Sequence, residues 1–194
     1  GHMANISRLA QSRQLVLAGP FDEGRPDPAM RGVIVLDVID AARAAELMQT
    51  DPAVAAGVFA VESYAWRTTA ALRQVLELDL AAEAARRANA TNGEQTFDIR
   101  LYVLAEACVT SAAAELFAGL AEEKKLLFFA RVPGDGEHRA YFLLDTGSVT
   151  EAEEMLAPLR DALTELRLHP WWATPRLAQL PDLDPSVGLS SSAR

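Results

Sequence analysis

Apolar positions in the first part of the chain alternate between helical spacing and short continuous runs. Ile6, Leu9 and Ala10 stand at the spacing of one helical face, whereas the run from Val33 to Leu36 is typical of a buried strand. Asp40 can cap a helix by accepting a backbone hydrogen bond. These patterns predict a helix over 4–14, strands over 15–18 and 32–36, a helix over 41–48, and a strand over 58–61 that continues toward Trp66.

The pattern restarts after a long helical stretch. Residues 68–90 are rich in Ala, Leu, Glu and Arg and predict a connecting helix, closed by a turn at Asn92-Gly93. The elements that follow are strand, helix, strand, strand, helix and strand, which is the split βαβ order of a ferredoxin-like sheet. Their predicted ranges are 97–105, 111–122, 126–130, 140–144, 150–163 and 165–169, with a turn at 133–136.

Two segments of the first part recur in the second. Residues 13–17 (RQLVL) correspond to 124–128 (KKLLF), and residues 31–37 (RGVIVLD) correspond to 139–145 (RAYFLLD). We therefore expect an α+β fold in which two ferredoxin-like repeats form a pseudo-dimeric α+β barrel. Two unrelated units with similar apolar patterns are the alternative. The expected divisions are a first repeat over 4–66, a connecting helix over 67–95, a second repeat over 96–173 and a C-terminal tail over 174–194.

Composition excludes several classes of partner. The chain has 194 residues and a net charge of −9, with 27 acidic against 18 basic residues. Because no basic stripe with interleaved aromatic residues is present, nucleic-acid binding is not expected. No apolar run approaches the roughly 20 residues that cross a bilayer, so no membrane span is expected. The single cysteine, Cys108, cannot form an intrachain disulfide, which suits a reducing, cytoplasmic compartment.

The first three residues, Gly1-His2-Met3, are typical of a scar left after removal of an affinity tag. The first repeat also begins directly with a helix and lacks the opening strand of the second. One hypothesis covers both features: the gene start was placed at an internal Met3, which removed an upstream strand, and the histidine of the scar restores the native one.

Three segments resemble the YCII-related domain family, whose members form dimeric α+β barrels from ferredoxin-like sheets. His2-Met3-Ala4-Asn5 with Leu9 resembles the family's His-Leu-Ala start of the first helix. Residues 15–21 (LVLAGPF) resemble its strand ending in Ala-Gly-Pro, and residues 51–59 (DPAVAAGVF) resemble its Asp-Pro-x-Val-x-Ala-Gly-x-Phe/Tyr segment. The resemblance is strong over residues 2–66. Over 97–172 it is limited to the element order and the His169-Pro170-Trp171-Trp172 ending.

The resemblance implies a site made of a histidine and an aspartate that face each other. On this chain they are His2 and Asp51, with His2 as general base and Asp51 as its orienting partner. A carboxylate beside an imidazole fixes the tautomer and raises the basicity of the ring, which prepares it for proton transfer. The family motifs also imply a substrate pocket at Gly19, Pro20, Phe21 and Phe59. No cofactor and no metal are expected, because no group of ligating residues has metal-site spacing.

The second repeat is expected to have lost the site. Ala113 stands at the position that corresponds to His2, and no Asp-Pro pair follows the second helix of that repeat. One pocket per chain is therefore expected, in a pseudo-dimeric monomer or a homodimer. His169 could line a pocket, but a residue that packs aromatic side chains at the sheet edge is the favoured interpretation.

Three functions remain open at this point. The resemblance implies a cofactor-independent lyase or isomerase that acts on a small apolar or aromatic molecule, because family members are implicated in dehydrochlorination of chlorinated aromatic compounds. The alternatives are a non-catalytic ligand-binding or accessory protein and a purely structural role. Fold alone does not choose between them.

Overall fold

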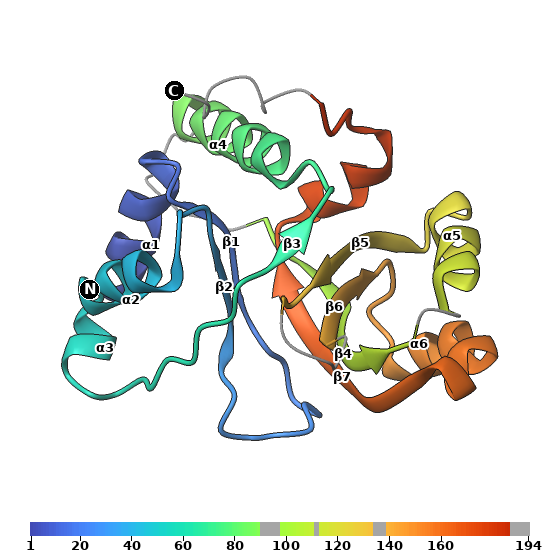
Figure 1. Ribbon diagram of the computed structural model, residues 1–194. Helices are drawn as coiled ribbons and strands as arrows, with labels where there is room; N and C mark the ends of the chain where they lie inside the picture. The colour runs from blue at the N-terminus through green and yellow to red at the C-terminus, as the bar shows by residue number, and fades with distance from the viewer. Residues whose placement is uncertain (90–97, 111–112, 134–138, 187–194) are drawn as a thin grey trace.

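The N-terminal part of the chain is a helix, a β-hairpin and two further helices. A computed structural model describes residues 1–89, 98–110, 113–133 and 139–186 (Figure 1). Strands β1 and β2 pair in an antiparallel two-stranded sheet. The elements of this part are α1 (His2–Gln11), β1 (Leu15–Pro20), β2 (Gly32–Leu36), α2 (Ala41–Gln49) and α3 (Pro52–Ala55).

The remaining elements build a second, antiparallel sheet of five strands in the order β3-β5-β6-β4-β7. Helix α4 (Leu72–Asn89) connects β3 to this part of the chain. The other elements are β3 (Arg67–Thr68), β4 (Arg100–Val109), α5 (Ala114–Glu122), β5 (Leu126–Arg131), β6 (Arg139–Leu144), α6 (Val149–Leu156), the 3₁₀ helix η2 (Ala157–Ala162), β7 (Leu163–Ala173) and the 3₁₀ helix η3 (Pro175–Asp182). These helices and antiparallel sheets confirm the α+β class.

The largest core lies between the two sheets. In Figure 1, α1 and α2 lie outside the hairpin, α5 and α6 lie outside the five-stranded sheet, and α4 crosses one end. Val16 and Leu17 of the hairpin share one buried cluster with Tyr102, Leu143 and Trp171 of the large sheet. Alternation along the strands sends the neighbouring side chains outward, to smaller cores beneath the flanking helices.

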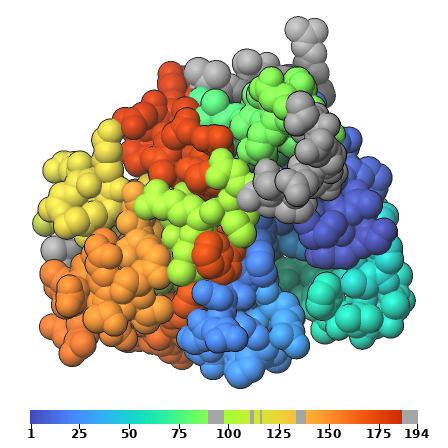
Figure 2. All heavy atoms as spheres, turned by 180° about the vertical axis from the view of Figure 1, so that it is seen from behind, coloured from blue at the N-terminus to red at the C-terminus, as the bar shows by residue number. Residues whose placement is uncertain are grey.

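The end of β1 joins the two sheets. Phe21 forms a β-bridge with Trp171 of β7, and the Trp171 indole Nε1 donates to the Gly19 carbonyl over 2.9 Å. A Cβ built on Gly19 would lie 1.9 Å from the carbonyl oxygen of Trp172, so only glycine allows this approach. Figure 2 shows this region from behind, where the chain after β1, in light blue, lies against the orange and red surface of the C-terminal part.

Local geometry recurs between the corresponding segments. Arg13 and Lys124 both have positive φ angles, 58° and 56°, at the turn between a helix and the next strand. The β1–β2 and β5–β6 pairs each carry a register shift at the same place, after Leu15 and after Leu126. The caps agree as well: Asp40 accepts from the third residue after it at the start of α2, and Ser148 does the same at the start of α6.

One predicted strand is wrong. Residues 58–66 form no strand, and only the short β3 pairs with β5 at Arg131 and Ala130. Val58 and Val61 are 70% and 43% exposed, so this apolar run has no sheet to cover it and its hydrophobicity misled the prediction.

Other predicted bounds need smaller corrections. The helix expected from residue 68 begins at Leu72, the strand expected over 97–105 spans Arg100–Val109, and the helix expected over 150–163 ends as α6 and continues as η2. The strand expected over 165–169 spans Leu163–Ala173 and contains Pro170. That proline is tolerated because β7 is an edge strand. The predicted turns at 92–93 and 133–136 and the end of the tail lie wholly or partly outside the described residues.

Candidate functional site

Asp51 is held between two helices by the local sequence. Its carboxylate caps α3, where the Ala53 amide donates to Oδ1 over 2.9 Å. Pro52 follows at the first helical position, where a missing amide hydrogen costs nothing. Asp51 is fully buried, with 0% of its surface exposed. A capping residue of this kind is usually exposed, so its burial calls for further donors.

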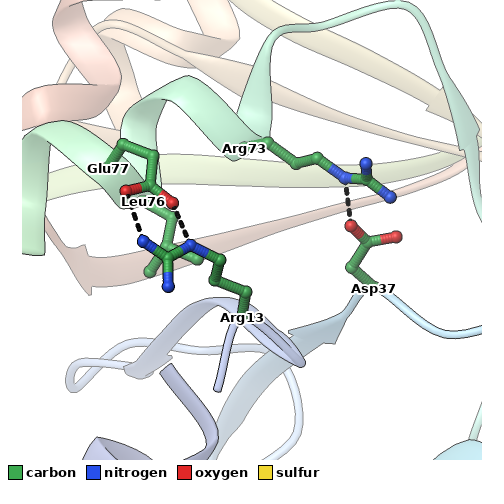
Figure 3. A pocket seen from close by; sticks show the side chains of 5 residues that line it. All are labelled: Arg13, Asp37, Arg73, Leu76 and Glu77. Carbon is green, nitrogen blue, oxygen red and sulfur yellow. Dashed lines mark hydrogen bonds and ion pairs between the residues drawn. The ribbon is translucent and has the colours of Figure 1, made fainter. Parts of the chain in front are cut away.

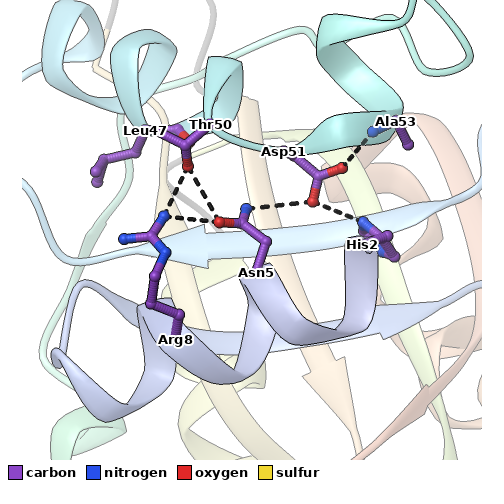
Figure 4. Close-up of polar contacts among 7 residues, drawn as sticks. All are labelled: His2, Asn5, Arg8, Leu47, Thr50, Asp51 and Ala53. Atoms are coloured by element: carbon purple, nitrogen blue, oxygen red, sulfur yellow. Dashed lines mark hydrogen bonds and ion pairs between the residues drawn. The ribbon is translucent and has the colours of Figure 1, made fainter.

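Helix α1 supplies those donors. His2 and Asn5 are three residues apart and therefore lie on the same side of the helix. The Nδ1 atom of His2 lies 2.8 Å from Asp51 Oδ2, and the Asn5 side-chain amide donates to the same oxygen over 3.2 Å (Figure 4). The predicted pair is thus in direct contact, although 49 residues separate its members in the sequence.

The environment keeps Asp51 ionised. Burial alone raises the pKa of the Asp51 carboxyl, but hydrogen bonds from the Ala53 amide, His2 and Asn5 outweigh it and hold that pKa below its ordinary value. At neutral pH the buried group is therefore a carboxylate that needs a donor at Oδ2. The Nδ1–H of His2 provides one.

A second set of contacts fixes Asn5. Nη2 of Arg8 donates to Asn5 Oδ1 over 2.6 Å and to Thr50 Oγ1 over 2.7 Å. The Thr50 hydroxyl in turn donates to the Leu47 carbonyl over 2.6 Å (Figure 4). Because Asn5 Oδ1 accepts from Arg8, its amide group must point toward Asp51. Arg8 and Thr50 act as positioning residues at the exposed side of the pair.

The His2 ring is partly open to solvent. Its side chain is 36% exposed, and the ring of Phe59 lies edge-on to it with centroids 5.5 Å apart. When Nδ1–H donates to Asp51, the Nε2 atom carries the free lone pair. The arrangement can therefore take a proton from a molecule that reaches Nε2.

The expected pocket residues do not all lie at this pair. Phe59 contacts His2, but Gly19 and Phe21 contact β7: Gly19 packs on Trp171 and Trp172, and Phe21 stacks on His169 with ring centroids 4.7 Å apart. Pro20 is exposed at the end of β1, opposite Gly32. The close packing of Gly19 on β7 therefore explains on structural grounds why glycine stands at this position.

Two pockets lie elsewhere, and neither is lined by His2 or Asp51. One of about 250 Å³ lies between the hairpin and α4, where Arg13 pairs with Glu77, and Arg73 pairs with Asp37 (Figure 3). Each charged side chain of this pocket pairs with one of opposite sign, and the two ion pairs connect α4 to residues at the ends of the hairpin. The other, of about 460 Å³, lies along β5.

Sequence reasoning missed Asn5, Arg8 and Thr50. A signal for Asn5 was available, because it shares the helical face of Ile6 and Leu9, where a buried amide needs partners. Glu106 was missed too, as a charge inside the apolar strand β4. Glu106 is 6% exposed and lies 3.4 Å from Arg139 and 3.9 Å from His169 Nε2. It does not belong to the predicted His2–Asp51 site.

The described residues hold no group of three or more His, Cys, Asp or Glu side chains arranged to bind a metal ion. In the same part of the chain, each helix is too short or too polar to span a membrane.

Fold and site together define an α+β protein with a buried aspartate that holds a histidine on its first helix. The sequence model of the YCII-related domain matches residues 1–66, the segment that contains both residues. This part of the chain is therefore similar to the YCII-related domain. No curated protein and no solved structure is significantly similar to the chain.

Proposed function

We propose that the chain is a cofactor-independent lyase or isomerase in which His2 is the general base and Asp51 is its positioning residue. The single observation that carries this proposal is the 2.8 Å contact between His2 Nδ1 and the fully buried Asp51 carboxylate. With the proton on Nδ1, the lone pair is on Nε2 of a ring that is 36% exposed, in the form that accepts a proton.

The expected chemistry is removal of a proton from carbon. The electron pair of the broken C–H bond either expels a leaving group from the neighbouring atom, as a lyase does, or moves a double bond, as an isomerase does. The imidazolium that forms is stabilised by the Asp51 carboxylate, which stays ionised in the resting site. Phe59 beside the ring favours a substrate with an apolar or aromatic body.

A non-catalytic ligand-binding or accessory role is the second candidate. It is favoured by the position of the two described pockets, since neither adjoins His2. Under this role His2 and Asp51 contribute to folding, the ligand binds away from them, and no bond is broken.

We also propose that the chain is a tandem fusion that forms a pseudo-dimeric α+β barrel, over the repeat ranges 4–66 and 96–173. The recurrent geometry at Arg13 and Lys124 and the matched register shifts support it. So do the contacts between the two parts of the chain: Phe21 forms a β-bridge with Trp171 of β7, and the short β3, directly after the first repeat, pairs with β5. The proposal includes a cytoplasmic location, for which the lone cysteine is the support.

The test uses proton exchange, because it precedes both reactions. The intact chain is incubated in D₂O with a panel of cyclic enones and β-chloro ketones, and deuterium incorporation and chloride release are followed by NMR and by ion chromatography. The proposal predicts exchange that is lost in both His2→Gln and Asp51→Asn. Exchange that persists in His2→Gln contradicts the assigned base, whereas saturable binding without exchange favours the second candidate.

A further inference from the structure

A groove on the outer side of β5 has features of a ligand site that the His2–Asp51 pair does not use. Its volume is about 460 Å³. One wall is the segment that contains β3, another is the end of α5 at Ala121, and the floor is β5. The lining residues that matter here are Arg67, Leu126, Leu127, Phe129 and Arg131.

Two arginines face each other at one end of the groove. Arg67 of β3 and Arg131 of β5 are directly opposed in the antiparallel register. Like charges at opposed positions repel each other, and side chains there project to the same face. Both residues are exposed, and neither forms an ion pair with any residue that the structure describes.

The Arg131 guanidinium packs on an aromatic ring at the groove. Its carbon lies 5.7 Å above the ring of Phe129, a cation–π contact that keeps the charge at the groove. Phe129 itself packs against Phe117 and Phe142 of the core beneath α5, so the platform under Arg131 is rigid. Both arginine charges therefore lie at this end of the groove.

The rest of the groove runs along the part of β5 that the short β3 does not cover. The strand pairs with only Arg131 and Ala130, and the remaining length of β5, through Leu126, Leu127 and Phe129, has no strand along this side. The carbonyl of Phe129 is satisfied by the Thr68 hydroxyl at 2.8 Å. Phe129, which is partly buried, and the edges of the buried Leu126 and Leu127 give the groove an apolar part beside the two arginines.

We propose that this groove binds a small amphipathic monocarboxylate, with the carboxylate between Arg67 and Arg131 and the alkyl or aryl body along Leu126–Phe129. The guanidinium groups match a carboxylate in charge and in planar hydrogen-bond geometry. A second copy of the chain is a poorer occupant, because the chain carries a net charge of −9 and two copies repel each other. The site is separate from His2 and Asp51 and does not depend on their function.

Titration calorimetry of the intact chain with sodium octanoate tests this proposal, with 1-octanol as the uncharged match. The proposal predicts saturable binding of octanoate, weaker binding of octanol, and an octanoate affinity that falls as salt is added. Replacing Arg67→Gln or Arg131→Gln lowers the octanoate affinity by roughly tenfold, the size of a lost charge-assisted hydrogen bond. Arg43→Gln is the control, since Arg43 is an exposed arginine of α2 that pairs with Glu46 away from the groove.

Each other outcome overturns the proposal. No saturable binding of octanoate leaves the groove without this ligand class. Equal affinity for octanoate and octanol removes the role of the arginines, and equal loss in Arg43→Gln shows a non-specific effect of net charge. If light scattering instead shows dimers that Arg67→Gln dissociates, the occupant is a second copy. Circular dichroism of each variant confirms that the sheet is intact.

Discussion

Asp51 Oδ2 accepts hydrogen bonds from two residues of one helix, His2 at 2.8 Å and Asn5 at 3.2 Å. The buried carboxylate therefore joins α1 to the start of α3 and also sets the orientation of the His2 ring. The Asp51 carboxylate thus has a role in folding as well as its proposed role in catalysis, and measurements of stability and of the His2 tautomer distinguish the two.

Loss of the Asp51 carboxylate destabilises the N-terminal part of the chain. Asp51→Ala removes the cap of α3 and leaves the buried Asn5 amide without its acceptor, so we expect a loss of about 2–4 kcal/mol in unfolding free energy. Asp51→Asn keeps the cap and is expected to cost less. Urea denaturation measures both.

The matched control is Asp40→Ala. Asp40 caps α2 by accepting from Arg43 N over 2.8 Å, but it is exposed. Its loss should cost only about 1 kcal/mol. Equal losses at the two positions would show that Asp51 acts merely as a helix cap.

Acid unfolding reports on the same carboxylate. The pKa of Asp51 is lowered in the folded chain from its ordinary 3.8, so the unfolded chain binds the proton more tightly. The stabilisation is fully present above about pH 5 and is lost as pH falls through 3.8 toward the lower folded value. Stability curves of the wild type and Asp51→Asn should therefore converge below that range. Parallel curves down to about pH 2 would contradict the assigned shift.

Protonation of His169 is expected to lower the stability of the fold at a higher pH than protonation of Asp51. Its ring is 1% exposed, stacks on Phe21, and neither ring nitrogen has a hydrogen-bond partner among the described residues. Burial lowers the pKa of His169. Among the charged groups around the ring, Glu106 and Asp27 raise this pKa and Arg167 lowers it, and burial has the largest effect. Because the unfolded chain gains a proton first, stability should fall as pH drops below about 6.5.

His169→Phe should reduce this dependence and leave that of Asp51 in place. Thermal unfolding at about pH 7.5 and 5.5 measures the difference. A melting temperature of His169→Phe that falls as steeply as in the wild type would remove His169 as the cause.

The junction between the sheets depends on the absence of a side chain at Gly19. Gly19→Ala places a Cβ 1.9 Å from a backbone oxygen of β7, which must move, so we expect a loss of about 2–3 kcal/mol or more. Gly119→Ala is the control, because that helical position has no atom within 4 Å of the added Cβ and should gain up to about 1 kcal/mol. Equal stability of the two variants in urea denaturation would show that the β1–β7 approach is not tight.

The sequence alone predicted the α+β class and the segment of the YCII-related domain, because periodicity and motif residues are local properties. It also predicted the His2–Asp51 contact through the family resemblance. It did not predict Asn5, Arg8 or Thr50 as partners of the pair, since their contacts arise only when α1 packs on the start of α3.

The wrong strand at 58–61 has a related cause. Hydrophobic runs indicate a strand only if a partner edge is available, and this run has exposed valines instead. For β7 the expected strand over 165–169 is too short, because β7 continues through Pro170, which the edge position tolerates.

The tautomer of His2 tests the central claim most directly. Long-range ¹H–¹⁵N NMR of the imidazole distinguishes a proton on Nδ1 from one on Nε2. The account predicts a proton on Nδ1, donated to Asp51, and a bare Nε2, with this preference lost in Asp51→Asn. A proton on Nε2 in the wild type, or a tautomer that Asp51→Asn leaves unchanged, would contradict it.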